Sequence, residues 1–213
     1  AANKVEEAHE LGAEKLAPMV RSMGFGEKFD LPFDNQRYGT VPEPQWMMRK
    51  YHREWQTYDT INMSIGQGMV LINPLQLAVM ASRLATGKRV VPRLLKNKPV
   101  VPQTQLAVDA DHLNFIRNAM AGVVDHGTAA GAKLPIDGIQ MAGKTGTAQT
   151  HRLSASERGN YTAANWKLRD HSLFMAFVPF NNPRYAAAAI VEHGGFGAAV
   201  AAPLIRDTLT YLY

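Results

Sequence analysis

The chain has 213 residues, 46% of them hydrophobic, and its 23 Lys and Arg against 18 Asp and Glu give a net charge of +5. This length and apolar content suffice to bury a core and are typical of one domain. Cysteine is absent, which excludes a disulfide framework and a thiolate metal site, and no apolar run reaches the roughly 18 to 20 residues of a membrane-spanning helix. The positive charge suits an anionic partner, but no basic stripe interleaved with aromatic residues indicates nucleic acid.

Local signals predict two helices in the first half of the chain. A short helix begins near Ala13 and ends at 22–24, although Pro18 inside it removes a hydrogen bond. A second helix covers 74–86, with Asn73 as its N-cap and Gly87 just past its end. Its apolar residues recur every three or four positions and predict a buried stripe, with Gln76 and Arg83 outside that stripe. The stripe comprises Leu77, Met80, Ala81 and Leu84.

A third helix is predicted to begin near Asp109 or Asp111 and to run to about Asp125, where His126-Gly127 stops it. One face of it carries apolar side chains and is expected to be buried. These side chains are Leu113, Ile116, Met120, Val123 and Val124.

The C-terminal third is predicted to be a sheet with a covering helix. Two apolar runs, 172–180 and 185–192, flank Asn181-Asn182-Pro183, whose turn chemistry indicates an antiparallel hairpin. With a strand at 144–147 they form three neighbouring strands. The alanine run within 185–192 has weak strand propensity, so we expect it to make room for a helix within Ala198–Leu212, whose regular start Pro203 delays. The polar segment 151–170 is expected to be a mobile loop that borders the site.

The strongest chemical signal lies between Met141 and Gln149. Lys144 supplies an ammonium, and Thr145 and Thr147 supply hydroxyls, beside an exposed backbone edge. In extended backbone Lys144 and Gly146 face one side and the two threonines the other, and the glycines at 143 and 146 let a ligand approach. This combination suits holding a carboxylate beside an acyl centre. Lys-Thr-Gly is an active-site element of serine acyl-transfer enzymes that bind penicillin, although a tripeptide alone also fits an ordinary strand entering a turn.

Further motifs surround the lysine element and resemble, in order and spacing, those of the class B penicillin-binding proteins, among them the cell-elongation transpeptidases of Gram-negative bacteria. The motifs are Asn62 to Gly68, Asn73 to Ala78, Arg184 to Gly195 and Ala201-Ala202-Pro203, with similar segments at Pro32 to Trp46, Asp59-Thr60 and Ala202 to Asp207. The resemblance extends from about residue 10 to the end. It implies an α+β fold: an antiparallel sheet covered by helices, as part of a penicillin-binding transpeptidase (serine β-lactamase-like) fold.

The resemblance also implies a function, a peptidoglycan D,D-transpeptidase that crosslinks stem peptides and is acylated by β-lactams. Lys144 and Thr147 would be catalytic, Lys144 through its charge and Thr147 through a backbone N–H that binds the oxyanion. Thr145, Gly146 and Thr147 would bind the substrate. No metal or organic cofactor is implied. The implied partners are stem peptides, β-lactam antibiotics and a membrane glycan polymerase at the periplasmic face of the inner membrane.

One departure from the family is clear, because its nucleophile element Ser-x-x-Lys and its second element Ser-x-Asn are absent. None of the six serines has Lys three residues on or Asn two residues on. In the family both elements lie upstream, so we expect residues 1–213 to be the C-terminal portion of one transpeptidase domain. A β-lactamase or β-lactam-sensing relative and a non-catalytic binding fragment remain as alternatives.

Other residues attract weaker hypotheses. His193, at a strand end, is expected to bond nearby backbone rather than act as a base, and the other histidines lack metal-ligand spacing. Asp59 and Glu54 would have to converge to form a paired-carboxylate site. Gly66-Gln67-Gly68 is expected to be a tight turn in the wall of the cleft, and Trp46 to Trp55 a packed surface loop.

Overall fold

The computed structural model describes residues 2–150 and 166–213. Most of the predicted polar loop at 151–170 therefore lies outside the described residues. The chain divides into two compact units, one formed by Ala1–Gln76 with Pro92–Val100 and the other by Leu77–Val91 with Val101–Tyr213. The predicted site belongs to the second unit, so the first is treated briefly.

In the first unit, α1 (Ala2–Ser22) consists of two helices that meet at Gly12, which has φ 57° and ψ 158°. The second of them matches the predicted short helix, and Pro18 lies inside it. α1 packs against α3 (Thr57–Ser64). The shared core contains Ala17, Val41 and Met63, with Leu16, Val20, Phe25, Trp55 and Val70 packed around them.

The prediction of a loop over 46–55 was wrong for 46–51, because α2 (Pro44–Tyr51) is a helix, and correct for 52–55. Pro44 occupies its first turn, where a missing N–H costs nothing, and buried Met47 anchors it. The helix ends at His52, which is left-handed at φ 53° and donates its backbone N–H to Met48 O. The helix has only 8 residues, fewer than the window of about 11 to 18 residues over which a helical period is recognised.

An ion pair precedes and caps α3. Both terminal nitrogens of Arg53 donate to the Asp59 carboxylate at 2.8 Å, and the Gln56 N–H donates to the same carboxylate at 2.9 Å. The hydrogen bonds from Arg53 are the main reason that the pKa of Asp59 lies below its ordinary value. Gly66-Gln67-Gly68 follows α3 and forms the predicted turn, with both glycines at positive φ.

The helix predicted at 74–86 is confirmed at both ends as α4 (Pro74–Thr86). Asn73 caps it, because Asn73 Oδ1 accepts from the Gln76 N–H at 2.9 Å while Gln76 Oε1 accepts from the Asn73 N–H at 3.2 Å. Three of the four predicted stripe residues are buried, namely Leu77, Ala81 and Leu84.

Gln76 and Arg83 were predicted to lie outside that stripe, and this was wrong, because both side chains are 0% exposed. Each side chain donates hydrogen bonds to a backbone carbonyl. Gln76 Nε2 donates to Tyr38 O at 2.8 Å, and Arg83 donates from Nε and Nη2 to Val90 O at 3.2 and 3.1 Å. Buried polar side chains normally have hydrogen-bond partners of this kind.

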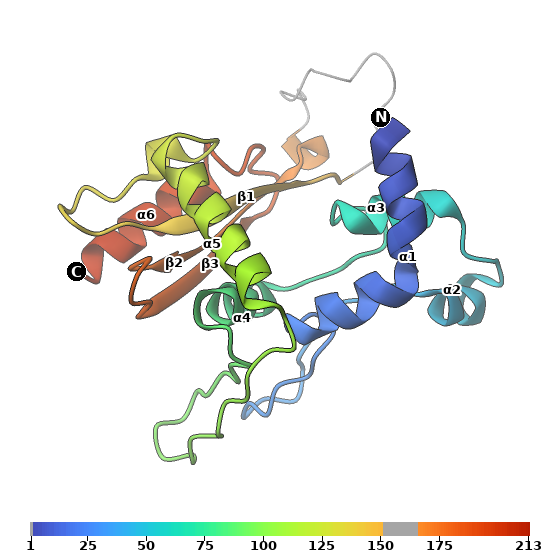
Figure 1. Cartoon of the computed structure of the whole chain (residues 1–213), viewed down its shortest axis with the longest axis horizontal. Coiled ribbons are helices and arrows are strands. Elements are labelled where there is room, and N and C mark those ends of the chain that lie inside the picture. Colours follow the sequence, from blue (N-terminus) through green and yellow to red (C-terminus); the bar gives the residue numbers. More distant parts are fainter. Residues whose placement is uncertain (1, 151–165) are drawn as a thin grey trace. The chain divides into compact units, whose positions relative to one another are not determined.

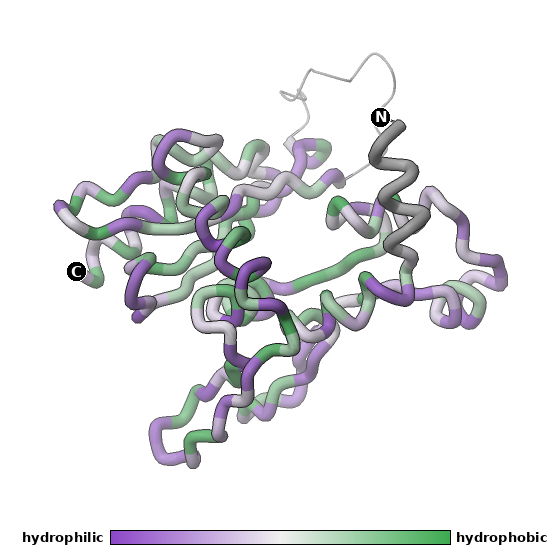
Figure 2. Tube along the Cα trace, viewed as in Figure 1, coloured by the Kyte–Doolittle hydropathy of each residue, from purple (hydrophilic) through white to green (hydrophobic). Residues whose placement is uncertain are grey.

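The second unit contains a three-stranded antiparallel sheet (Figure 1). Its strands are β1 (Ala142–Ala148), β2 (His171–Val178) and β3 (Tyr185–Val191), in the order β1-β2-β3, which confirms the predicted arrangement. β2 ends two residues earlier than predicted, because Pro179 has no N–H for the ladder. In Figure 2 the hairpin turn after β2 is hydrophilic, whereas the strands on either side are largely apolar.

Two helices cover this sheet. α5 (Ala110–Asp125), capped by Asp109, packs on β1, and α6 (Ala201–Tyr211) packs on β2 and β3. The core joins them through Val124, Ala129, Ala132, Leu134, Met141, Phe174, Ala176, Val178, Ala189, Ala201, Ala202, Ile205 and Leu209. The alanine run therefore does make room under a helix, and Pro203 lies in the first turn of α6, after the delayed start that was predicted.

The predicted buried face of α5 is only partly correct. Met120 and Val124 are buried, whereas Ile116 is 43% exposed. The buried residues of α5 all lie in its C-terminal half. Among the described residues, the N-terminal half of the apolar stripe is therefore not buried by a neighbouring element.

Candidate active site

The four residues of the lysine motif lie together on β1. Lys144 is exposed, and Thr145, Gly146 and Thr147 are half-buried. β1 is the first strand of the sheet, and among the described residues no strand pairs with its outer side. The extended backbone and the open edge that the sequence predicted are both present.

The ammonium of Lys144 lies at this open edge. Lys144 Nζ donates to the backbone carbonyl of Thr145 at 2.7 Å. In an antiparallel ladder the N–H and C=O of one residue point to the same side of the strand, and the side alternates along the chain. The hydrogen bond from the exposed ammonium of Lys144 indicates that the carbonyl of Thr145 faces the outer edge. The N–H of Thr147, two residues on, then points to that edge as well. A cation and a backbone donor therefore lie on one stretch of the outer edge of β1.

Two glycines near the motif are required by packing rather than by a ligand. At Gly143 a Cβ would overlap the ring of Phe174 and lie 2.9 Å from Met175 O. The expectation that Gly143 leaves room for a ligand was therefore wrong, because the core fills that space. Gly197, just before α6, lies against β1 in the same way. A Cβ there would overlap Leu173 O and lie 2.5 Å from Gly146 O.

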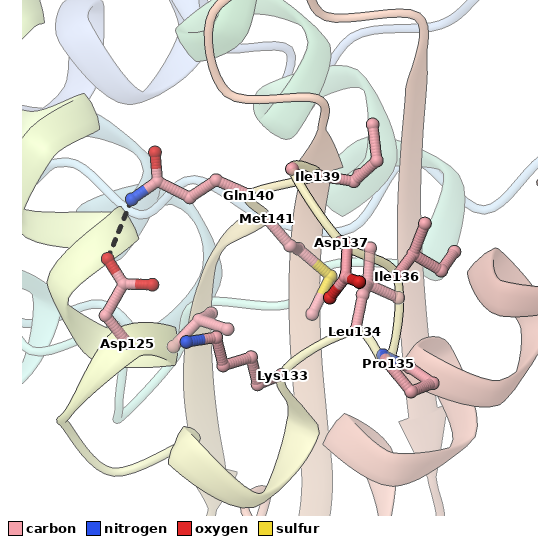
Figure 3. Close-up of a pocket in the computed structure, with 11 residues that line it drawn as sticks. Asp125, Lys133, Leu134, Pro135, Ile136, Asp137, Ile139, Gln140 and Met141 are labelled. Atoms are coloured by element: carbon pink, nitrogen blue, oxygen red, sulfur yellow. Dashed lines mark hydrogen bonds between the residues drawn. The ribbon is translucent and has the colours of Figure 1, made fainter.

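Two side-chain contacts link the C-terminal end of α5 and the turn after it to β1 and the residues just before it. Gln140, just before the strand, donates from Nε2 to Asp125 Oδ2 at 2.7 Å, as the dashed line in Figure 3 shows. Further along, the hydroxyls of Thr128 and Thr145 lie 3.2 Å apart. The sequence at 126–127 predicts only a helix stop. It does not indicate Thr128, because no local pattern links this residue to a partner 17 positions later.

Beside the hydrogen bond between Gln140 and Asp125 is an open cavity of about 430 Å³. The end of α5 and residues 133–141 line it, with apolar Leu134 and Met141 and with Lys133 and Asp137 among the polar residues (Figure 3). None of the residues predicted for the site lines this cavity.

The described serines all form hydrogen bonds with backbone groups. Ser22, Ser64 and Ser82 each donate to a carbonyl three or four residues earlier, at 2.6, 2.8 and 2.9 Å. Ser172 is fully buried, donates to Phe196 O and accepts from the Ala201 N–H, both at 3.0 Å. Such serines stabilise the fold and are poorly placed to attack a substrate.

The weaker candidates have structural roles as well. The backbone N–H of His193 donates to His171 Nδ1 at 2.9 Å, and His193 Nδ1 lies 3.0 Å from Arg169 O, which confirms the expected contact with nearby backbone. Asp59 is held by Arg53 instead of by a second carboxylate. Within 2–150 and 166–213, no three acidic or histidine side chains converge on a metal-binding position, and no helix has the length and apolarity to cross a bilayer.

The family model described as the penicillin binding protein transpeptidase domain matches residues 4–210 of this chain. The peptidoglycan D,D-transpeptidase MrdA of Acinetobacter baumannii is 35% identical over 211 residues, which is 92% of this chain and 31% of that protein. The chain thus spans about a third of the length of this relative.

Solved structures agree with the sequence relatives. Penicillin-binding protein 2 of Helicobacter pylori, in a complex with MreC, superposes with a TM-score of 0.80 at 31% identity over 99% of this chain and 38% of that one. Penicillin-binding protein 2 of Pseudomonas aeruginosa, in complex with WCK 5153, gives a TM-score of 0.79 at 31% identity over 99% of this chain and 46% of that one. These likenesses confirm the fold class and the resemblance that the motifs indicated. The chain belongs to the penicillin-binding protein transpeptidase domain family.

Proposed function

We propose that this chain forms one wall of the active site of a peptidoglycan D,D-transpeptidase that crosslinks stem peptides during cell-wall elongation and is acylated by β-lactams. One observation supports this function above the others. Lys144 to Thr147 lie on a strand whose outer edge is open among the described residues, with the ammonium at that edge. A peptide that ends in a carboxylate can lie along such an edge and meet a cation, hydroxyls and a backbone N–H.

Each residue of the motif has a proposed role. Lys144 supplies positive potential and assists proton movement, and Thr145 and Thr147 offer hydroxyls to the substrate carboxylate. The backbone N–H of Thr147 binds the oxyanion that develops on the attacked carbonyl. Gly146, without a side chain, leaves the strand smooth where the substrate lies. No metal or organic cofactor has a part in this chemistry.

The nucleophile is proposed to come from outside these 213 residues, which would then be the C-terminal portion of one transpeptidase domain. A serine oxygen attacks the carbonyl of the D-alanyl-D-alanine bond, and the terminal D-alanine leaves with the proton on its amine. An amine of a neighbouring stem peptide then attacks the ester and frees the serine. The sequence contains no Ser-x-x-Lys or Ser-x-Asn element, and the described serines are occupied by backbone groups.

The proposed setting is the periplasmic face of the bacterial inner membrane, where stem peptides are crosslinked. The related Helicobacter pylori protein was solved with MreC, which supports a partner of that kind for the full-length protein here. A membrane glycan polymerase is a second proposed partner, because a crosslinking enzyme needs newly made glycan strands.

Mass spectrometry after incubation with benzylpenicillin tests the function. The full-length protein is expected to gain one covalent penicilloyl group on a serine outside residues 1–213, whereas the 213-residue chain alone gains none. A chromogenic β-lactam separates the alternatives, because a transpeptidase acylates and stalls while a hydrolase turns over. Absence of any adduct on the full-length protein would contradict the proposal and favour a non-catalytic binding role.

A further inference from the structure

We propose that Thr128 is a positioning residue for substrate binding, which orients the hydroxyl of Thr145 toward the substrate carboxylate. This inference rests on the proposed function of the β1 edge. Thr128 Oγ1 lies 3.2 Å from Thr145 Oγ1, and either oxygen can be the donor. Thr128 follows α5, 17 residues before its partner, and it is exposed.

The backbone on both sides of Thr128 is fixed, so its hydroxyl cannot drift far. The Gly127 N–H donates to Gly122 O at 2.9 Å, and the Ala129 N–H donates to Val123 O at 3.0 Å. Ala129 is buried in the core. At Gly127 a Cβ would lie only 2.7 Å from the Cα of Val123, which shows how tightly this turn closes on the helix. The strand partner is fixed as well, because Thr145 is paired with Phe174 in the sheet.

The direction of the hydrogen bonds explains what Thr128 can contribute. A threonine hydroxyl has one proton to donate and two lone pairs that accept. When Thr145 donates its proton to a carboxylate, its oxygen remains free to accept from the hydroxyl of Thr128. Two hydroxyls in series polarise each other, and the second selects the rotation of the first that points at the ligand. Thr128 thus acts through Thr145 without touching the substrate.

The expected change in substrate binding depends on how exposed the hydroxyls of Thr128 and Thr145 are. One neutral hydrogen bond at a half-exposed site corresponds to roughly a 2- to 10-fold change in binding. A purely structural role would reduce acylation by every ligand alike, whereas a role toward the carboxylate would affect only ligands that carry one.

The experiment compares Thr128→Val and Thr128→Ser in the full-length protein, with Thr208→Val as a matched control. Thr208 is an exposed threonine of α6 whose hydroxyl bonds Leu204 O within the helix. The second-order rate constant of acylation is measured with benzylpenicillin and with its methyl ester, in which the carboxylate is blocked. We expect Thr128→Val to slow acylation by benzylpenicillin about 2- to 10-fold with little change for the ester, and Thr128→Ser to restore the rate.

A double mutant completes the test, because Thr128→Val should have no further effect once Thr145→Val removes its partner. Equal slowing with both ligands, or failure of serine to restore the rate, would overturn the inference while leaving the proposed function standing. If the wild-type protein forms no adduct with either ligand, the proposed function fails and the role of Thr128 falls with it.

Discussion

Replacing Gly197 with alanine tests how closely the segment before α6 supports the lysine motif. The added Cβ would overlap Leu173 O and lie 2.5 Å from Gly146 O and 3.0 Å from Gly146 N. All three atoms are backbone, so no side chain can rotate away. Since non-bonded heavy atoms prefer separations near 3.5 Å, relief requires a movement of about 1 Å in β1, in β2 or in the segment before α6.

Overpacking of this kind costs about 1 to 3 kcal/mol. For a domain of about this length, 213 residues, such a loss lowers the thermal midpoint by roughly 2 to 12 °C. Function should suffer as well, because a displacement of about 1 Å at a site that positions substrate can reduce the rate about 100-fold. The assays are thermal denaturation and benzylpenicillin acylation of the purified full-length protein.

The control is Gly131→Ala, because an added Cβ at Gly131 would meet no atom within 4 Å. It should leave both the midpoint and the acylation rate almost unchanged. If Gly197→Ala were as stable and as reactive as Gly131→Ala, the close contact between Gly197 and the β1–β2 pair would not exist in solution, and the support ascribed to it would be refuted.

Three further predictions concern the core, an ion pair and the motif itself. Leu209→Ala, at a side chain that is 1% exposed against the sheet, should lower the free energy of unfolding in urea by about 2 to 5 kcal/mol, whereas Leu204→Ala at a 51% exposed position should change it far less. The pKa of Asp59 is lowered by Arg53, so the ionised carboxylate stabilises the fold above the ordinary aspartate pKa of about 4 and loses this effect as pH falls through its lower folded value. The stability gap between wild type and Asp59→Asn, followed by thermal melts, should therefore be widest above about pH 5 and close in acid; a constant gap would contradict the role of the charge. Lys144→Ala should slow benzylpenicillin acylation of the full-length protein by at least about 100-fold without lowering the thermal midpoint, and unchanged acylation would argue against a site at the β1 edge.

Elements with local signals were predictable from the sequence. Asn73 and Pro74 marked the start of α4, and Gly87 marked its end. The hairpin of β2 and β3 was visible because a short polar turn separates two apolar runs. In each case the residues that decide the structure are neighbours in the chain, so a short window contains the whole reason for it.

What could not be predicted depends on partners far away in sequence. Gln76 reads as an exposed helix residue until the carbonyl of Tyr38, 38 residues earlier, is placed beside it. The same holds around the site. Lys144, Thr145 and Thr147 are proposed as site residues from their motif. The contact of Gly197 with Gly146, in contrast, spans 51 positions and has no signature in the sequence of either segment. Long-range contacts of this kind are set by the fold and not by local preference.

The open edge of β1 explains why so many of these long-range contacts meet at one strand. In the proposed function a substrate binds along the strand, which requires that no second strand pairs with this edge. An edge without a second strand lacks the support that such a neighbour would provide and invites pairing with another chain. The described contacts compensate on the other sides: Asp125 holds the start of the strand through Gln140, Thr128 contacts its middle, and Gly197 covers Gly146. Lys144 protects the edge itself, because its ammonium occupies the carbonyl of Thr145 and its charge disfavours a second strand. In the proposed function the same side chain turns from that carbonyl to an arriving carboxylate, a stronger charged acceptor.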